Sequence, residues 1–208
     1  MDDNFQLHTN PSEFWGSYRS SYVLNTQLSK EGIDLIQSLH RALQDNFSDA
    51  ILIPPDNALH ITLMDWIAPL VAYSEDKEHL FTSHFPQYDV SLKHTLQNQH
   101  PIQVKFNQIK VTPDAIIIIG KDDGSYDRIR SEFLKQQDLI PGTKRPPQII
   151  HSTIARFSNP VEIEKVQEAV QGIQINFVQV IDHFRLTKES RVPMLEFEEI
   201  KRYLLIDE

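Results

Sequence analysis

The chain has 208 residues, of which 40% are hydrophobic, so it is long enough for one or two domains that fold without disulfide or metal staples. It contains no cysteine, which excludes disulfides, thiol nucleophiles, cysteine-ligated zinc and iron–sulfur clusters. Its formal net charge of −9 argues against long duplex nucleic acid as a partner, because Lys and Arg contacts with phosphates supply most of the affinity for such ligands.

The first half of the chain alternates strand and helix patterns after an N-terminal segment, residues 1–17, that we expect to form an arm or irregular lid. The patterned segments are a strand around Tyr22–Leu24, a helix from Ser29 to Phe47, a strand from His60, a helix over 75–99 and a strand over 102–111. Ser29 is a capping residue, and Pro54 and Pro55 prevent the first helix from continuing. Pro86 predicts a break in the second helix.

The second half shows the same kinds of segment. They are a strand over 114–120, a helix that begins after Asp122–Ser125, a strand from His151, a helix from Asn159 through Gln171, and strands over 173–188 and 194–206. The first of these strands is apolar throughout, which predicts burial on both faces. Asn159, with Pro160 and Glu162 after it, is typical of a helix start, and Gly172 ends that helix.

The two halves repeat one order of elements at matching intervals. From Val23 in the first strand to His60 the interval is 37 residues, and from Ile116 to His151 it is 35. A pair of prolines precedes each histidine by a few residues. We infer an internal repeat, which places the two histidine strands in equivalent positions about a pseudo-twofold axis.

The repeat predicts two strand-helix-strand-helix-strand units in one domain. The predicted domain spans residues 1–208, with a first repeat of about 18–112 and a second of about 113–208.

Each histidine strand carries the pattern His-x-Thr followed by an apolar residue. Side chains alternate along a strand, so His60 projects with Thr62, and His151 with Thr153, toward one face. An imidazole transfers protons near neutral pH and a hydroxyl donates a hydrogen bond. Two copies facing one cleft predict a site that handles a phosphodiester, with one histidine accepting a proton and the other donating one.

These two motifs and the duplication resemble those of the two-histidine phosphoesterase superfamily. The resemblance spans most of the chain and implies a bilobal α+β fold, in which antiparallel sheets line a central cleft and the motifs lie on facing strands. It also implies that His60 and His151 act as acid and base on either side of the scissile phosphate. By the same resemblance, Thr62 and Thr153 bind the non-bridging oxygens, and no metal or cofactor is needed.

Other residues are weaker candidates for substrate binding. Lys144 and Arg145 precede the second motif in a flexible basic segment, which either steers an anion into the cleft or is a solvated loop. Tyr22 and Tyr126 occupy roughly equivalent places in the two halves. Arg156 alternates away from His151 and is expected to be structural unless a bulge rotates it.

A metal site is not expected. Four histidines follow one another between residues 79 and 100: His79, His84, His94 and His100. Their spacings match neither a helical pair one turn apart nor a known zinc pattern, which favours a solvated helical face.

The sequence therefore predicts a metal-independent phosphodiesterase that opens a 2′,3′-cyclic nucleotide or an RNA-end cyclic phosphate. Its partner is a small nucleotide or RNA end, and we expect a monomer. The acidic start and the lack of a long apolar run predict a cytoplasmic protein without a membrane segment. Three alternatives stay open: a hydrolase of linear 2′–5′ or 3′–5′ oligonucleotides or cyclic dinucleotides, a non-catalytic nucleotide-binding module, and an interaction protein in which the motifs are accidental.

Overall fold

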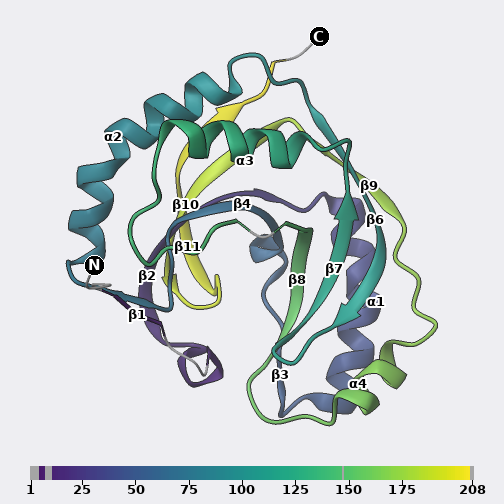
Figure 1. Ribbon diagram of the computed structural model, residues 1–208. Helices are drawn as coiled ribbons and strands as arrows, with labels where there is room; N and C mark the ends of the chain where they lie inside the picture. Colours follow the sequence, from purple (N-terminus) through teal and green to yellow (C-terminus); the bar gives the residue numbers. More distant parts are fainter. Residues whose placement is uncertain (1–4, 8–10, 147, 207–208) are drawn as a thin grey trace.

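A computed structural model describes residues 5–7, 11–146 and 148–206. It has an α+β fold with two antiparallel main sheets, as the family resemblance implied (Figure 1). The first sheet has the order β11-β10-β2-β4, from β2 (Tyr18–Gln27), β4 (His60–Ile67), β10 (His183–Arg191) and β11 (Glu196–Leu204). The second has the order β3-β8-β7-β6-β9, from β3 (Ile51–Leu52), β6 (Ile102–Val111), β7 (Ala115–Lys121), β8 (Ile150–Phe157) and β9 (Phe177–Ile181).

Helices and short strands connect the strands of the two main sheets. The helices are α1 (Lys30–Phe47), α2 (Lys77–Leu96), α3 (Ser125–Gln136) and α4 (Ile163–Val170). Short pieces are β1 (Phe5–Leu7) paired with β5 (Val71–Tyr73), and 3₁₀ turns over Pro11–Phe14 and Asp56–Ala58. Residues 1–4 and 8–10 of the predicted N-terminal arm lie outside the described residues. Pro147, in the segment before β8, does so too.

Each sheet contains strands from both halves of the chain. The first-half strand β6 pairs with β7 of the second half, and the second-half strand β10 pairs with β2 of the first half. The motif strands β4 and β8 lie in different sheets and contact one another. This exchange of strands joins the two halves and brings both motifs to the middle of the molecule.

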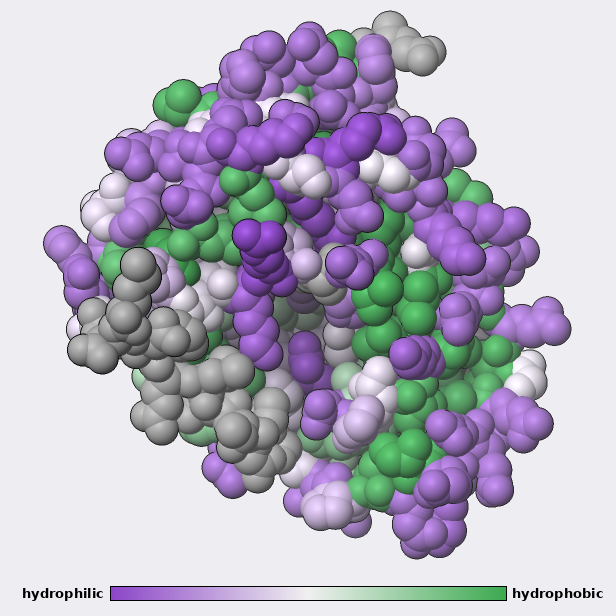
Figure 2. All heavy atoms as spheres, viewed as in Figure 1, coloured by the Kyte–Doolittle hydropathy of each residue, from purple (hydrophilic) through white to green (hydrophobic). Residues whose placement is uncertain are grey.

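A pair of helices covers each sheet. Helices α2 and α3 pack together over the first sheet, and α1 and α4 pack over the second (Figure 1). Helix α1 approaches β9 closely: a Cβ added at Gly32 would lie 2.6 Å from the ring of Phe177. The predicted cap is present, since the hydroxyl of Ser29 accepts a hydrogen bond from the backbone N–H of Gly32 at 3.3 Å. In the same view, Figure 2 shows a hollow near the centre of a largely hydrophilic face.

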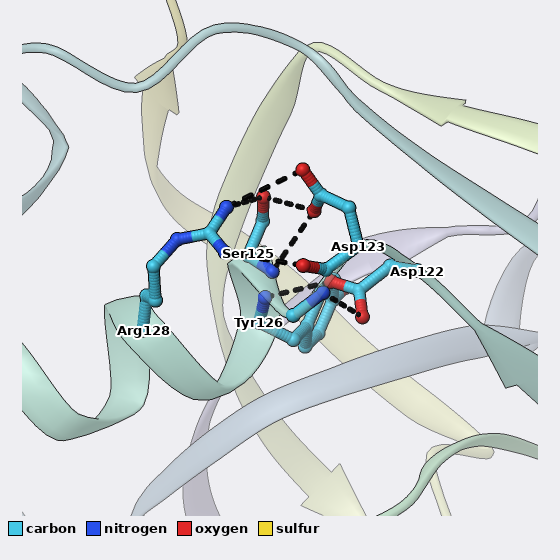
Figure 3. Close-up of polar contacts among 6 residues, drawn as sticks. Asp122, Asp123, Ser125, Tyr126 and Arg128 are labelled. Atoms are coloured by element: carbon cyan, nitrogen blue, oxygen red, sulfur yellow. Dashed lines mark hydrogen bonds and ion pairs between the residues drawn. The ribbon is translucent and has the colours of Figure 1, made fainter.

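The turn before α3 is held by its own side chains (Figure 3). The Asp122 carboxylate accepts hydrogen bonds from the backbone N–H groups of Gly124 at 2.9 Å and Tyr126 at 2.8 Å. The Asp123 carboxylate accepts from the backbone and hydroxyl of Ser125. Carboxylates at a helix N-terminus satisfy free N–H groups and complement the helix dipole, so this sequence starts α3 firmly.

Three local predictions were wrong. Helix α2 runs without interruption through Pro86, as a curved helix. The strand predicted over 173–188 is two strands that separate at Asp182 and enter different sheets. Helix α4 begins at Ile163 rather than near Pro160, because the Asn159 side chain donates to the Asp49 carbonyl at 2.6 Å instead of capping.

In the described part of the chain, no helix combines the length and apolar character that crossing a bilayer requires.

Candidate active site

One cavity of about 330 Å³ contains both motifs. His60 and Thr62 line it from β4, and His151 and Thr153 line it from β8. The residues between them, Ile61 and Ser152, are buried on the opposite face of their strands. The structure therefore brings the four motif side chains together, as the alternation of an extended strand requires.

The His60 imidazole is fixed by a backbone carbonyl. Its Nδ1–H donates to the Ala58 carbonyl at 2.6 Å, in the turn that precedes β4. This bond leaves Nε2 of the neutral ring as the nitrogen that can accept a proton. The pKa of His60 is lowered to about 4, chiefly by burial and in part by the positive charges of Arg185 and Arg156, while the bond to Ala58 opposes these effects.

His151 has a closely similar environment. It hydrogen-bonds the backbone of Ile149, two residues before it, as His60 bonds Ala58. Burial lowers the pKa of His151, with Arg156 and Arg130 adding to the effect. Both rings are therefore neutral at pH 7 without a ligand, and His151 itself contributes to the low pKa of His60. A phosphate anion between them would raise both pKa values.

A β-bulge follows the threonine in each motif strand. Between β2 and β4 the register skips Leu63, and between β7 and β8 it skips Ile154. Each skipped residue and its successor are both buried, so the alternation of side chains reverses there. The fifth residue after each histidine consequently turns toward the cavity: Asp65 on β4 and Arg156 on β8. The sequence placed Arg156 away from His151 unless a bulge rotated it, and this bulge is present, so Arg156 lines the cavity.

Buried side chains from the helices hold both bulges. His40 of α1 donates from Nε2 to the Ile154 carbonyl at 2.8 Å. Arg130 of α3 donates to the Leu63 carbonyl at 2.8 Å and to the Thr62 carbonyl at 3.0 Å. A bulge leaves carbonyl groups without a ladder partner, and buried carbonyls need one. The two helices thus occupy equivalent positions and stabilise equivalent irregularities.

Opposite charges meet in the cavity around Arg156. The electrostatic influence of Asp65, Asp114 and Glu189 reaches its guanidinium, which also lies 4.9 Å from the centre of the Trp15 ring. Burial raises the pKa of Asp65 to about 6, and the charges of Arg156 and Lys144 oppose that rise. Asp65 is therefore ionised above pH 6.

Two parts of the cavity lining could not be predicted from the sequence. Trp15, directly after the first 3₁₀ turn, lines it and donates from its indole N–H to the Phe157 carbonyl at 3.1 Å. Residues 192–194, between β10 and β11, line it from another side. Glu189 holds that connection, since its carboxylate accepts hydrogen bonds from the Met194 backbone N–H and the Ser21 hydroxyl.

The weaker candidates lie elsewhere. Lys144 and Arg145 are exposed and outside the cavity lining, although the charge of Lys144 reaches Asp65. Tyr22 is buried, and its hydroxyl donates to Glu78 at 2.5 Å. Tyr126 is buried beside Phe184. Neither tyrosine lines the cavity. The two are not equivalent in the repeat either, since Tyr22 lies on β2 and Tyr126 lies in the first turn of α3.

Within the described residues, no group of three or more His, Asp or Glu side chains is arranged to hold a metal ion. The four histidines between residues 79 and 100 are spread along and just beyond α2, away from the cavity lining.

Comparison with solved structures assigns the fold. The chain superimposes on TT0787 of Thermus thermophilus with a TM-score of 0.65 at 14% identity, covering 89% of this chain and 97% of that one. It superimposes on Escherichia coli LigT in apo form with a TM-score of 0.63 at 13% identity, covering 91% and 99%. The chain has the LigT fold. A crystal structure described as a phosphoesterase matches with a TM-score of 0.58 at 14% identity, covering 89% and 98%.

No family model and no curated protein sequence matches the chain. At 13–14% identity the LigT likeness establishes the fold, and the chemistry must be argued from this chain's own residues.

Proposed function

We propose that this protein is a two-histidine phosphodiesterase that opens a 2′,3′-cyclic nucleotide or RNA-end cyclic phosphate without a metal. The observation that carries the proposal is the convergence of His60, Thr62, His151 and Thr153 on one cavity from two different sheets. If these four residues had only structural roles, the two equivalent imidazole and hydroxyl pairs would not need to face the same cavity.

The proposed reaction uses one water molecule and two proton transfers. The imidazole that is neutral accepts a proton from water as the water oxygen attacks phosphorus. The bond from phosphorus to one ribose oxygen breaks, and the protonated imidazole donates its proton to that oxygen. The product is a nucleoside monophosphate, and the proton taken up at one ring equals the proton released at the other.

The lowered pKa values of His60 and His151 are consistent with one histidine acting as base and the other as acid. Both rings are neutral in the free protein, so either of His60 and His151 is ready to act as base. Binding of the phosphate anion supplies the negative charge that stabilises a proton on the second ring. The hydroxyls of Thr62 and Thr153, with the guanidinium of Arg156, would stabilise the charge that grows on the non-bridging oxygens.

Ligands of the LigT structures agree with a small nucleotide as substrate. LigT has been crystallised with 3′-AMP, with ATP and with NADP+, at TM-scores of 0.54, 0.56 and 0.60 to this chain. A cavity of about 330 Å³ lies at the lower end of the usual range for small-molecule sites, roughly 300–1,000 Å³, which suits one nucleotide unit. We propose a monomeric cytoplasmic enzyme that forms one bilobal unit.

The test is turnover of nucleoside 2′,3′-cyclic phosphates by the wild type and by the His60→Ala and His151→Ala variants. Each substitution should lower kcat by about 10²–10⁴, which is the usual contribution of a general acid or base. Addition of a chelator should leave the wild-type rate unchanged. Equal rates in all three proteins would contradict the assignment. A panel of linear 2′–5′, 3′–5′ and cyclic dinucleotide substrates, assayed alongside, separates the alternative phosphodiesters from the cyclic phosphate.

A further inference from the structure

Asp65 breaks the symmetry of the site. It occupies on β4 the position that Arg156 occupies on β8, three residues after the motif threonine and beyond the same bulge. A carboxylate repels a phosphate, so Asp65 cannot serve the anion as Arg156 does. The pair instead gives the cavity one cationic wall and one acidic wall.

The carboxylate of Asp65 is available to a ligand. It lines the cavity, and no side chain or backbone group of the described residues donates a hydrogen bond to it. The other two acids of the lining differ. Glu189 is 2% exposed and already accepts from Ser21 and Met194, and Asp114 lies exposed in the turn before β7.

A cyclic phosphate leaves few donors for Asp65. The proposed substrate uses both the 2′ and 3′ oxygens in the phosphate ring, and within an RNA end the 5′ oxygen is esterified. The remaining hydrogen-bond donors of the terminal nucleotide are then on the base, whereas a free nucleoside cyclic phosphate also has its 5′ hydroxyl, which is common to all four nucleosides and cannot discriminate between them. Three strand steps separate Thr62 from Asp65, at most ~10 Å, which is the scale of the distance between a ribose phosphate and a base edge.

Among the four RNA bases, guanine alone presents two neighbouring N–H donors, at N1 and at the exocyclic amine. Adenine and cytosine place a ring nitrogen acceptor beside their amine, and uracil flanks its N–H with two carbonyl oxygens, so each would set a lone pair against the carboxylate. We propose that Asp65 is a specificity-determining residue that makes this phosphodiesterase prefer guanosine 2′,3′-cyclic phosphate ends. This inference rests on the proposed function.

The experiment compares kcat/KM for the 2′,3′-cyclic phosphates of guanosine, adenosine, cytidine and uridine at pH 7.5, with the wild type, Asp65→Asn and Asp114→Asn. Asparagine keeps the size of Asp65 but offers one acceptor and one donor. The wild type should favour guanosine, and Asp65→Asn should lower the ratio of guanosine to adenosine kcat/KM by about 10- to 100-fold, the effect expected from charge-assisted hydrogen bonds. Asp114→Asn, the same substitution at the exposed rim, should leave that ratio unchanged.

A second readout does not require turnover. Calorimetric titration of 3′-GMP and 3′-AMP into the same three proteins should show the same selective loss in Asp65→Asn. A wild type without guanine preference overturns the inference, as does an equal loss for both bases in Asp65→Asn, or a change of the ratio in Asp114→Asn alone. If no cyclic phosphate is turned over, the proposed function fails, whereas the affinity ratio of 3′-GMP to 3′-AMP still decides the role of Asp65.

Discussion

Replacing His60 by asparagine should remove a pH dependence of stability that the buried imidazole creates. The pKa of His60 is lowered to about 4 by burial, against about 6.5 in an unfolded chain. Below pH 6.5 the unfolded chain therefore binds a proton that the folded protein does not bind until the pH nears 4. The stabilisation is fully present above pH 6.5 and is lost as the pH falls through this window, by about 2 kcal/mol at pH 5 and about 3 kcal/mol at pH 4.

Asparagine is the matched replacement because its amide nitrogen takes the place of Nδ1 and can still donate to the Ala58 carbonyl. Urea unfolding at pH 7 and pH 5 measures the effect, and the wild type should lose about 2 kcal/mol more than His60→Asn between these values. His94→Asn, which removes an exposed imidazole on α2, is the control. Equal losses in the wild type and His60→Asn would show that burial does not keep this ring neutral.

Three further substitutions test the surroundings of the site. His40→Leu leaves the buried Ile154 carbonyl unpaired, so it should lower the free energy of unfolding by about 1–3 kcal/mol in urea. It should also raise KM, because the bulge that it loosens turns Arg156 toward the cavity. An unchanged KM would show that this bulge does not affect substrate binding. Gly120→Ala should lower stability by about 1–3 kcal/mol, since the new Cβ would lie 2.5 Å from Val104; an unchanged midpoint would contradict this close packing. Tyr126→Phe should keep full activity and stability, because it removes only a buried hydroxyl that has no hydrogen-bond partner among the described residues. A fall in kcat would show instead that Tyr126 contributes to the site.

The sequence predicted those parts of the structure that depend on local periodicity. The alternation of His60 with Thr62 needs only an extended backbone, so the placement of each motif pair on one face could be predicted from two residues. The repeat located both strands in equivalent positions, and the family resemblance supplied the α+β class. The exchange of strands between sheets could not be predicted, because pairing depends on contacts between distant segments, such as β6 with β7 and β10 with β2.

Residues that reach the site through tertiary contacts were harder to predict. Trp15 enters the cavity lining from a segment without a period, and nothing in its neighbours indicates that position. Tyr22 and Tyr126 were matched by their approximate places in the two halves, but the structure puts Tyr22 on strand β2 and Tyr126 in helix α3, so that match was wrong. Their side chains pack in the core, where the apolar area of an aromatic ring is most stabilising.

A bulge follows the threonine in both motif strands, and in both it turns a charged residue toward the cavity, so the bulge belongs to the architecture of the site. The signal was present in the sequence as two polar residues, Asp65 and Arg156, at the same distance from their histidines. Strict alternation assigns both to the core, where an unpaired charge is very costly. Two charges at equivalent positions that both violate the pattern therefore indicate a reversal of the alternation. The buried donors on α1 and α3, His40 and Arg130, are the groups that make this reversal stable.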